Sequence, residues 1–158
     1  MKKLFWIVFC LLQLELSACS KKNDDKDNTP KIVAADATKI IVQSGFGWVD
    51  CFPAETFELV GLDLSYKRKM KDESCEIKST DSTKVLTQDQ RDLLIKKIES
   101  LRFKAWAQPC NSDYATQTVE IMRSNSSIKY HVYLCKEGYY IEYEDFFDLL
   151  KTMNQLTT

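Results

Sequence analysis

Residues able to carry out catalysis are few in this chain of 158 amino acids. Its one histidine, His131, would need a nucleophile and an orienting carboxylate to work as a general base. The sequence holds no Gly-x-Ser-x-Gly element that would supply the nucleophile. Because a solvent-facing strand residue explains His131 more simply, we expect no catalytic residues and a protein that is not an enzyme.

Four carboxylates lie close together near the C-terminus: Glu142, Glu144, Asp145 and Asp148. Paired carboxylates can cleave glycosidic bonds, so an enzyme with an unrecognised carboxylate site is an alternative. The preferred interpretation is a charged helix start, where the positive end of the helix dipole favours acids. We also expect no metal site and no cofactor, since the chain has neither a Cys-x-x-Cys pair nor a calcium loop of regularly spaced aspartates.

Aromatic residues are dense in the same region: Tyr139, Tyr140, Tyr143, Phe146 and Phe147. Tyrosine and tryptophan are enriched at interfaces, so Tyr139 and Tyr140 are candidates for a binding patch. Trp48, in a turn with two glycines at residues 44–48, is a third candidate. The partner of such a patch would be a protein or a glycan. Core packing of the last helix explains the two phenylalanines more simply.

The charge balance argues against a polyanionic partner. The chain carries 22 Lys and Arg against 23 Asp and Glu, which gives a formal net charge of −1. This balance provides no electrostatic drive toward nucleic acid or an anionic bilayer, so we expect no nucleic-acid partner. The short basic run Lys67-Arg68-Lys69 is interpreted as a solvated hairpin end rather than an anion site.

The elements that must position these residues follow from the hydrophobic pattern. Thr87 and Gln90 have the spacing of a capping box, and Leu94, Ile98 and Leu101 continue at helical spacing, which predicts a helix over 88–101. A second apolar stripe predicts a C-terminal helix: Phe146, Leu149, Leu150 and Met153. Strand-like segments are expected at 39–42, 56–60, 64–69, 118–123 and 128–134, with 75–79 as a continuation of the sheet.

The order of these elements predicts the fold class. Two hairpins, each followed by a helix, give the order hairpin-helix-hairpin-helix. Hairpins make an antiparallel sheet, and the helices must bury their apolar stripes against it. We therefore expect an α+β fold of two layers, with one antiparallel sheet covered by two helices, in a single domain over residues 39–158.

The N-terminal segment has the character of an export signal. Met1-Lys2-Lys3 is positive, and residues 4–12 form a run of nine apolar residues. A membrane span needs roughly 20 such residues, so the run has the length of a signal-peptide core instead. Directly after it, Leu16-Ser17-Ala18-Cys19 resembles the lipobox of bacterial lipoproteins. A secretory signal with a coincidental cysteine is the alternative.

The lipobox resemblance implies a defined processing route. Signal peptidase II would remove residues 1–18 by cutting between Ala18 and Cys19, and Cys19 would carry covalent lipid, including palmitate. Each buried methylene contributes about 0.8 kcal/mol, so two or more acyl chains anchor a protein stably. Apart from this covalent lipid on Cys19, we expect no cofactor. The membrane would be a partner of the protein through the lipid anchor.

Residues 19–38 are expected to form a lipidated, flexible tether, because the segment is polar and lacks aromatic residues. Ser20 follows the lipidated cysteine in place of the aspartate that retains lipoproteins at the inner membrane, and this resemblance favours the outer membrane. The acids Asp24, Asp25 and Asp27 resemble the export tag of surface lipoproteins in the Bacteroidota. A solvated linker explains them equally well, so the periplasmic face and the cell surface both stay open.

Four cysteines remain in the exported part: Cys51, Cys75, Cys110 and Cys135. An even number in an oxidising compartment indicates two disulfides, with three pairings open. We favour Cys51–Cys75, because a hairpin register that sets residue 57 opposite 69 also sets 51 opposite 75. We favour Cys110–Cys135 on its similar spacing alone.

A second resemblance covers most of the domain. Ser44-Gly45-Phe46-Gly47, followed by Cys51, a hairpin and the helix at 87–101 ending in Phe103, is similar to a domain-of-unknown-function family of small bacterial lipoproteins. The family implies no activity. We therefore expect a lipid-anchored exported protein that works as a non-catalytic binding or interaction module. An inhibitor of a secreted or host enzyme is the first alternative, and the carboxylate enzyme is the second.

Overall fold

The structure, a computed structural model, describes residues 29–45, 53–69, 80–106, 117–132 and 138–158. All six cysteines and Trp48 lie outside these ranges. The predicted disulfides, the lipid site at Cys19 and the cleavage after Ala18 therefore stay predictions. Within the described ranges, no helix is both long enough and apolar enough to cross a bilayer.

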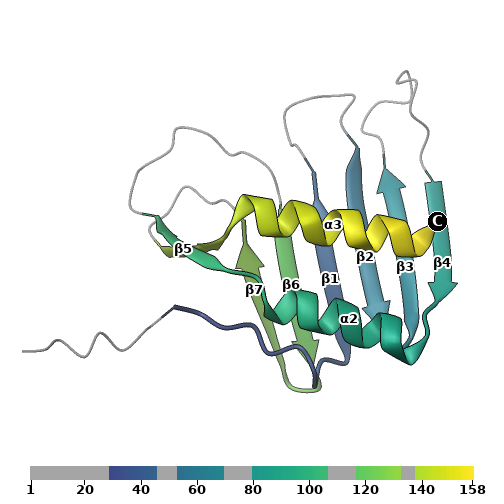
Figure 1. Cartoon of the computed structure of the whole chain (residues 1–158), viewed down its shortest axis with the longest axis horizontal. Helices are drawn as coiled ribbons and strands as arrows, with labels where there is room; N and C mark the ends of the chain where they lie inside the picture. Colours follow the sequence, from purple (N-terminus) through teal and green to yellow (C-terminus); the bar gives the residue numbers. More distant parts are fainter. Residues whose placement is uncertain (1–28, 46–52, 70–79, 107–116, 133–137) are drawn as a thin grey trace, which may run out of the picture.

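Two antiparallel sheets form the framework (Figure 1). The larger has six strands in the order β4-β3-β2-β1-β6-β7, and the smaller pairs β5 with β8. The strands of the larger sheet are β1 (Lys39–Ser44), β2 (Ala54–Val60), β3 (Asp63–Lys69), β4 (Thr80–Val85), β6 (Thr118–Arg123) and β7 (Ser126–His131). Those of the smaller sheet are β5 (Phe103–Trp106) and β8 (Gly138–Ile141).

Two helices, α2 (Gln88–Glu99) and α3 (Tyr143–Thr157), lie on the same face of the six-stranded sheet and run across its strands (Figure 1). The predicted capping box opens α2. Thr87 Oγ1 accepts a hydrogen bond from the Gln90 N–H at 3.3 Å, and the Gln90 side chain accepts one from the Thr87 N–H at 2.9 Å. Such a cap satisfies backbone donors that the first helical turn leaves unpaired.

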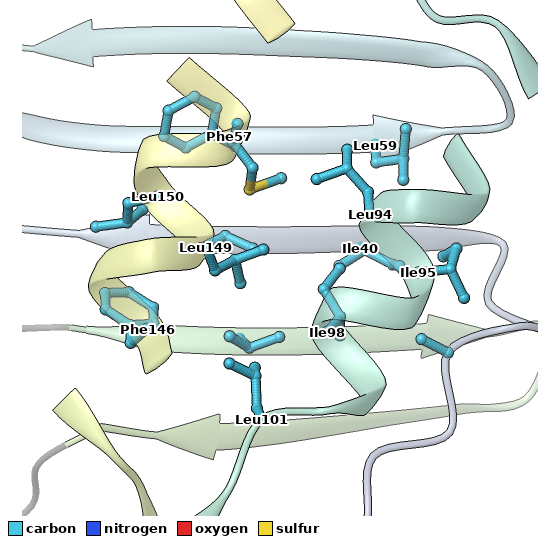
Figure 2. Close-up of a cluster of buried hydrophobic side chains, with 14 of the residues drawn as sticks. Ile40, Phe57, Leu59, Leu94, Ile95, Ile98, Leu101, Phe146, Leu149 and Leu150 are labelled. Carbon is cyan, nitrogen blue, oxygen red and sulfur yellow. The ribbon is translucent and has the colours of Figure 1, made fainter. Parts of the chain in front are cut away.

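The core lies between the helices and the sheet (Figure 2). Alternate residues of each strand face the helices, so Ile40 and Val42 of β1 lie opposite Leu59 and Phe57 of β2 and are almost fully buried. The apolar stripes of both helices pack on this face: Leu94, Ile95, Ile98, Phe146, Leu149, Leu150 and Met153. Burying one such side chain contributes about 1.5–3 kcal/mol. The predicted α+β fold, an antiparallel sheet covered by two helices, is confirmed.

The opposite face of the sheet is polar. Lys39 and Glu58 form an ion pair at 2.7 Å on this face. On the neighbouring strands, Glu120 accepts a hydrogen bond from Ser127 at 2.7 Å and pairs with Lys129 at 3.0 Å. Apolar residues on one side of the strands and charged residues on the other are typical of a sheet with one solvated face.

The predicted register of the first hairpin is wrong by three residues. Phe57 lies opposite Tyr66, not opposite residue 69, because Gly61 and Leu62 alone make the turn between β2 and β3. Gly61 has a φ of +58°, which glycine adopts without the strain that a side chain would cause. The register argument for Cys51–Cys75 is therefore lost, while the pairing itself lies outside the described residues.

Three strands were not expected from the pattern. All six residues of β4 are exposed, and it is an edge strand of the sheet, so its sequence lacks an apolar face. The four-residue strands β5 and β8 are too short to show an alternation. In β7 the strand begins at Ser126, so the expected loop over 124–127 shortens to a turn at residues 124 and 125.

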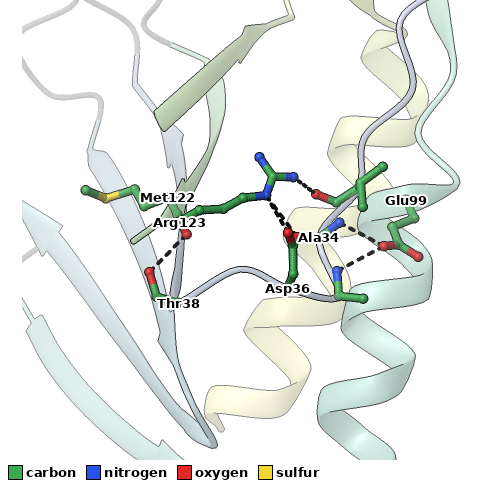
Figure 3. Close-up of polar contacts among 8 residues, drawn as sticks. Ala34, Asp36, Thr38, Glu99, Met122 and Arg123 are labelled. Carbon is green, nitrogen blue, oxygen red and sulfur yellow. Dashed lines mark hydrogen bonds and ion pairs between the residues drawn. The ribbon is translucent and has the colours of Figure 1, made fainter. Parts of the chain in front are cut away.

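The fold also begins earlier than residue 39. A segment that we call the strap, residues 32–38, lies against the end of the domain where β1 starts, and its Ile32 and Ala34 belong to the core. The carboxylate of Glu99, at the end of α2, accepts hydrogen bonds from the Ala34 N–H at 2.8 Å and the Ala35 N–H at 3.1 Å (Figure 3). The domain start that we expected at residue 39 is therefore too late.

Contacts to β6 hold the other half of the strap (Figure 3). Arg123 donates from Nε to both carboxylate oxygens of Asp36 at 2.9 Å, and its Nη2 donates to the carbonyl of Val33. Thr38 donates from its backbone N–H to the Met122 carbonyl at 2.9 Å. The strap is thus tied to both layers of the fold, to α2 through Glu99 and to the sheet through Arg123.

Candidate functional site

A groove lies between one flank of α3 and the adjoining ends of β1 and β2. Its volume is about 430 Å³, within the range of roughly 300–1,000 Å³ that is usual for ligand sites. The residues that line it are Ser44, Pro53, Glu55, Phe147, Leu150, Lys151, Asn154 and Gln155. Segments about 100 residues apart in the sequence therefore form its two walls.

The helical wall of the groove carries an exposed aromatic ring. Phe147, Lys151 and Asn154 follow one another at four and three residues, so they lie on one flank of α3. Phe147 is 57% exposed, whereas the neighbouring Leu150 is 6% exposed and forms an apolar floor. One turn before Phe147, Tyr143 is 52% exposed, and the centroids of the two rings lie 5.9 Å apart.

The strand wall carries a carboxylate that is held in place. Glu55 and Arg68 lie directly opposite each other on β2 and β3 and face the helices. Glu55 Oε1 accepts hydrogen bonds from Tyr66 Oη at 2.7 Å, from Arg68 Nε at 3.2 Å and from Arg68 Nη2 at 2.8 Å. The Arg68 guanidinium also lies 5.6 Å from the centre of the Tyr66 ring.

This arrangement makes Tyr66 a fixed donor rather than a proton carrier. Burial, followed by the hydrogen bond to Glu55, raises the pKa of Tyr66 to about 12. The hydrogen bond to Glu55 likewise raises the pKa of Arg68. At neutral pH the phenol therefore keeps its proton and the guanidinium its charge, so the three side chains can orient and bind but are poorly matched to acid–base catalysis.

Several polar groups of the groove have no partner inside the described part of the chain. The ammonium of Lys151, the side-chain amides of Asn154 and Gln155, and the hydroxyl of Ser44 make no hydrogen bond or ion pair with another described residue. Glu55, by contrast, is neutralised by Arg68 at 2.8 Å. The groove therefore offers free donors, free acceptors and one uncompensated positive charge.

The aromatic residues predicted as a binding patch are separated by the fold. Tyr139 is 43% exposed and Tyr140 only 9%, because neighbouring strand residues point to opposite sides of β8. Only Tyr139 of the two presents a ring to solvent, and Trp48 lies outside the described residues. The exposed rings beside the groove are those of Tyr143 and Phe147. Core packing, the simpler explanation for both phenylalanines, is therefore right for Phe146 and wrong for Phe147.

None of the four carboxylates considered for catalysis lines the groove, and two of them bind residues of other segments. Asp145 accepts hydrogen bonds from the backbone N–H of Arg102 at 2.9 Å and from its guanidinium at 2.7 and 3.0 Å, and these bonds lower the pKa of Asp145. Asp148 pairs with Lys97 of α2. No group of three or more metal-ligating side chains occurs among the described residues.

The remaining candidates also separate in space. His131 lies on the polar face of the sheet opposite Thr118, and burial together with the positive charge of Lys129 lowers its pKa. In the basic run, Arg68 turns toward Glu55, while Lys67 and Lys69 point to the other side of β3. The three cations therefore do not form one anion site.

Sequence reasoning missed the groove because neither wall carries a motif. The one available signal was the position of Phe147 beside the buried stripe of α3, which implies an exposed ring on a helix that packs on a sheet. Comparison with protein-family models, curated proteins and solved structures found no match.

Proposed function

We propose that this chain is a lipid-anchored, non-catalytic binding module of the outer membrane, with the groove beside α3 as its ligand site. One observation carries the binding role: an exposed aromatic ring, Phe147, stands beside polar side chains that have no partner within the described chain. A ligand that covers the ring removes apolar surface from water, and its own polar groups can replace the hydrogen bonds that the polar side chains make to water.

The chemistry of the ionisable groups supports binding over catalysis. Tyr66 keeps its proton up to a pKa of about 12. The carboxylates Asp145 and Asp148 are held in ion pairs with Arg102 and Lys97, away from the groove. A catalytic carboxylate pair would have to converge on a common site.

The relative position of strap and groove favours a ligand from the aqueous side. The strap enters the domain where β1 begins at Lys39, and the groove lies where β1 ends at Ser44, about 17–20 Å away for six strand residues. With the lipid on Cys19, the twelve residues 20–31 would reach at most about 43 Å. The anchor would thus hold the domain near the bilayer by the end remote from the groove.

Substitution of the lipobox cysteine tests the anchor. In the native cell, Cys19→Ser should abolish palmitate labelling and move the protein from the membrane fraction to the soluble or secreted fraction. Cys10→Ser is the matched control, because this cysteine lies in the predicted signal peptide, so labelling should persist. Unchanged membrane association and labelling of Cys19→Ser would refute the anchor.

Substitution of the exposed ring tests the groove. Material that crosslinks to the protein on intact cells should be lost in Phe147→Ala and kept in Leu93→Ala, which removes an equally exposed apolar side chain (56% exposed) from α2. Equal recovery with both variants would show that the groove is not the ligand site.

A further inference from the structure

We propose that the groove binds an acidic oligosaccharide, with sugar rings stacked on Phe147 and Tyr143 and an anionic group of the ligand paired with Lys151. This inference rests on the proposed function, in which the groove is the ligand site. It goes further by assigning the chemical class of the ligand.

The aromatic rings provide the surface for stacking. A pyranose ring has a face of C–H bonds that packs on an aromatic ring, while its hydroxyls point outward to polar partners. Phe147 and Tyr143 are each more than half exposed, and their ring centroids lie 5.9 Å apart along α3. From Tyr143 to Asn154 the helix rises roughly 16 Å. The surface is therefore elongated and suits a chain of sugars better than a single one.

The polar groups match hydroxyls in kind. A sugar hydroxyl both donates and accepts hydrogen bonds, and so do the side chains of Asn154, Gln155 and Ser44. These three line the groove and bond to no other described residue through their side chains. A ligand rich in hydroxyls can satisfy all of them, whereas an apolar ligand would leave them unpaired, at a cost in affinity.

The charge of the groove favours an acidic sugar. Glu55 is neutralised by Arg68, with an N–O distance of 2.8 Å. Lys151 has no carboxylate partner within the described chain, which leaves a net positive charge at the rim. A carboxylate or sulfate on the ligand would compensate this charge, with a contribution that salt weakens.

The walls of the groove are poorly suited to a peptide. A peptide that adds to a sheet needs a free strand edge, but β1 and β2 are interior strands whose backbones pair with their neighbours. A helix that docks in a groove needs a continuous apolar floor, and here the apolar floor is limited to Leu150 and Pro53 beside the Phe147 ring.

Titration of the lipidated full-length protein in neutral lipid vesicles tests the inference. The acidic ligands are oligogalacturonate, a heparin fragment and oligosialic acid, each six sugars long. Maltohexaose is the neutral glycan, and hexaglutamate is the acidic peptide. We expect at least one acidic oligosaccharide to bind more tightly than maltohexaose and hexaglutamate.

The variants assign the roles within the groove. Phe147→Ala should weaken binding of the acidic oligosaccharide at least tenfold, whereas Phe147→Trp should retain it because the larger ring also stacks. Lys151→Gln should reduce the preference for the acidic ligand over maltohexaose and flatten its salt dependence. Leu93→Ala on α2 should bind as the wild type does. Thermal unfolding of each variant verifies that the fold is intact, which the exposure of all three side chains favours.

Each other outcome contradicts a definite part of the reasoning. Failure of all three acidic oligosaccharides to bind, or equally tight binding of maltohexaose, overturns the assignment of an acidic glycan. If hexaglutamate binds more tightly than the oligosaccharides and its binding depends on Phe147, the ligand is not a glycan, although the groove is still the ligand site. If Phe147→Ala leaves oligosaccharide binding unchanged, the groove is not the ligand site. That result would also refute the proposed function.

Discussion

Replacing Glu99 by alanine should detach the strap and lower the stability of the whole domain. The Glu99 carboxylate accepts hydrogen bonds from the backbone of Ala34 at 2.8 Å and of Ala35 at 3.1 Å. Ala34 is fully buried, so its N–H would lose its partner without gaining free access to water. The Ala35 N–H is exposed and can bond to water instead.

The magnitude follows from these two bonds. A hydrogen bond to a charged group contributes about 1.5–3 kcal/mol, and an exposed donor that rehydrates costs much less. We therefore expect Glu99→Ala to reduce the free energy of unfolding by about 2 kcal/mol, or roughly 6–10 °C in Tm for a domain of this size. Glu99→Gln keeps an acceptor oxygen but loses its charge, and it should cost about half as much.

Urea unfolding and amide hydrogen exchange together check this prediction. Lys96→Ala is the matched control, because Lys96 is an exposed residue in the same turn of α2 and its side chain has no described partner. The control should change the unfolding free energy by less than about 0.5 kcal/mol. Exchange of the Ala34 amide should accelerate in Glu99→Ala more than exchange in the centre of β1. Equal stability of Glu99→Ala and Lys96→Ala, with unchanged exchange at Ala34, would refute the role of the strap.

Two further predictions concern α3. Phe146 is fully buried, whereas its neighbour Phe147 is 57% exposed. In urea unfolding, Phe146→Ala should therefore lower the free energy of unfolding by about 3–5 kcal/mol, and Phe147→Ala by less than about 1 kcal/mol. Similar losses in both variants would contradict the assigned face of the helix. Hydrogen bonds from Arg102 lower the pKa of Asp145 below its ordinary value of about 4. The ionised carboxylate therefore contributes its full stabilisation above the ordinary pKa, and this contribution is lost as the pH falls through the lower pKa of the folded state. Asp145→Asn should therefore be clearly less stable than the wild type at pH 7, and the difference should shrink as the pH falls below about 4. A difference that stays constant over this range would exclude the linkage.

Much of the fold could be predicted because its signals are local. Thr87 and Gln90 cap a helix with their own side chains, and the strand at Thr118–Arg123 occurs with the bounds that its apolar alternation predicts. The buried stripe of α3 was equally readable, since Phe146 and Met153 face the sheet as their spacing requires. Each of these features depends on residues within one or two turns of one another.

The features that were missed depend on contacts distant in the sequence. β4 carries no apolar alternation because it is an edge strand with two solvated faces, and pairing with β3 alone makes it a strand. The strap does not stand out from the polar tether before it, because its apolar residues are mostly alanines and follow neither a helical nor a strand periodicity. It is ordered by Glu99 and Arg123, which follow it by more than 60 residues. The hairpin register failed for a related reason, since the length of the turn at Gly61 decides it and the strands alone do not.

The groove illustrates the same limit for function. Core packing was the simpler explanation for Phe147 in the sequence, yet its ring is exposed and lines a groove with Ser44 and Glu55, which come from strands about 100 residues earlier. Only the packing of α3 across the sheet brings them together. The free amides of Asn154 and Gln155 gain meaning from this packing alone, because on an isolated helix they would be ordinary solvated side chains.

The proposed anchor and the proposed ligand also explain each other physically. An open groove on a small domain encloses little of its ligand and therefore binds weakly by itself. Many copies held by lipid in one membrane can, however, engage successive units of one polysaccharide, and the later contacts then form at high effective concentration. Such engagement requires that the groove face the aqueous side and that each copy turn freely enough to reach the polymer. In the proposed arrangement the strap enters the fold at the end opposite the groove, which favours the first condition, and the predicted tether between lipid and strap would provide the second.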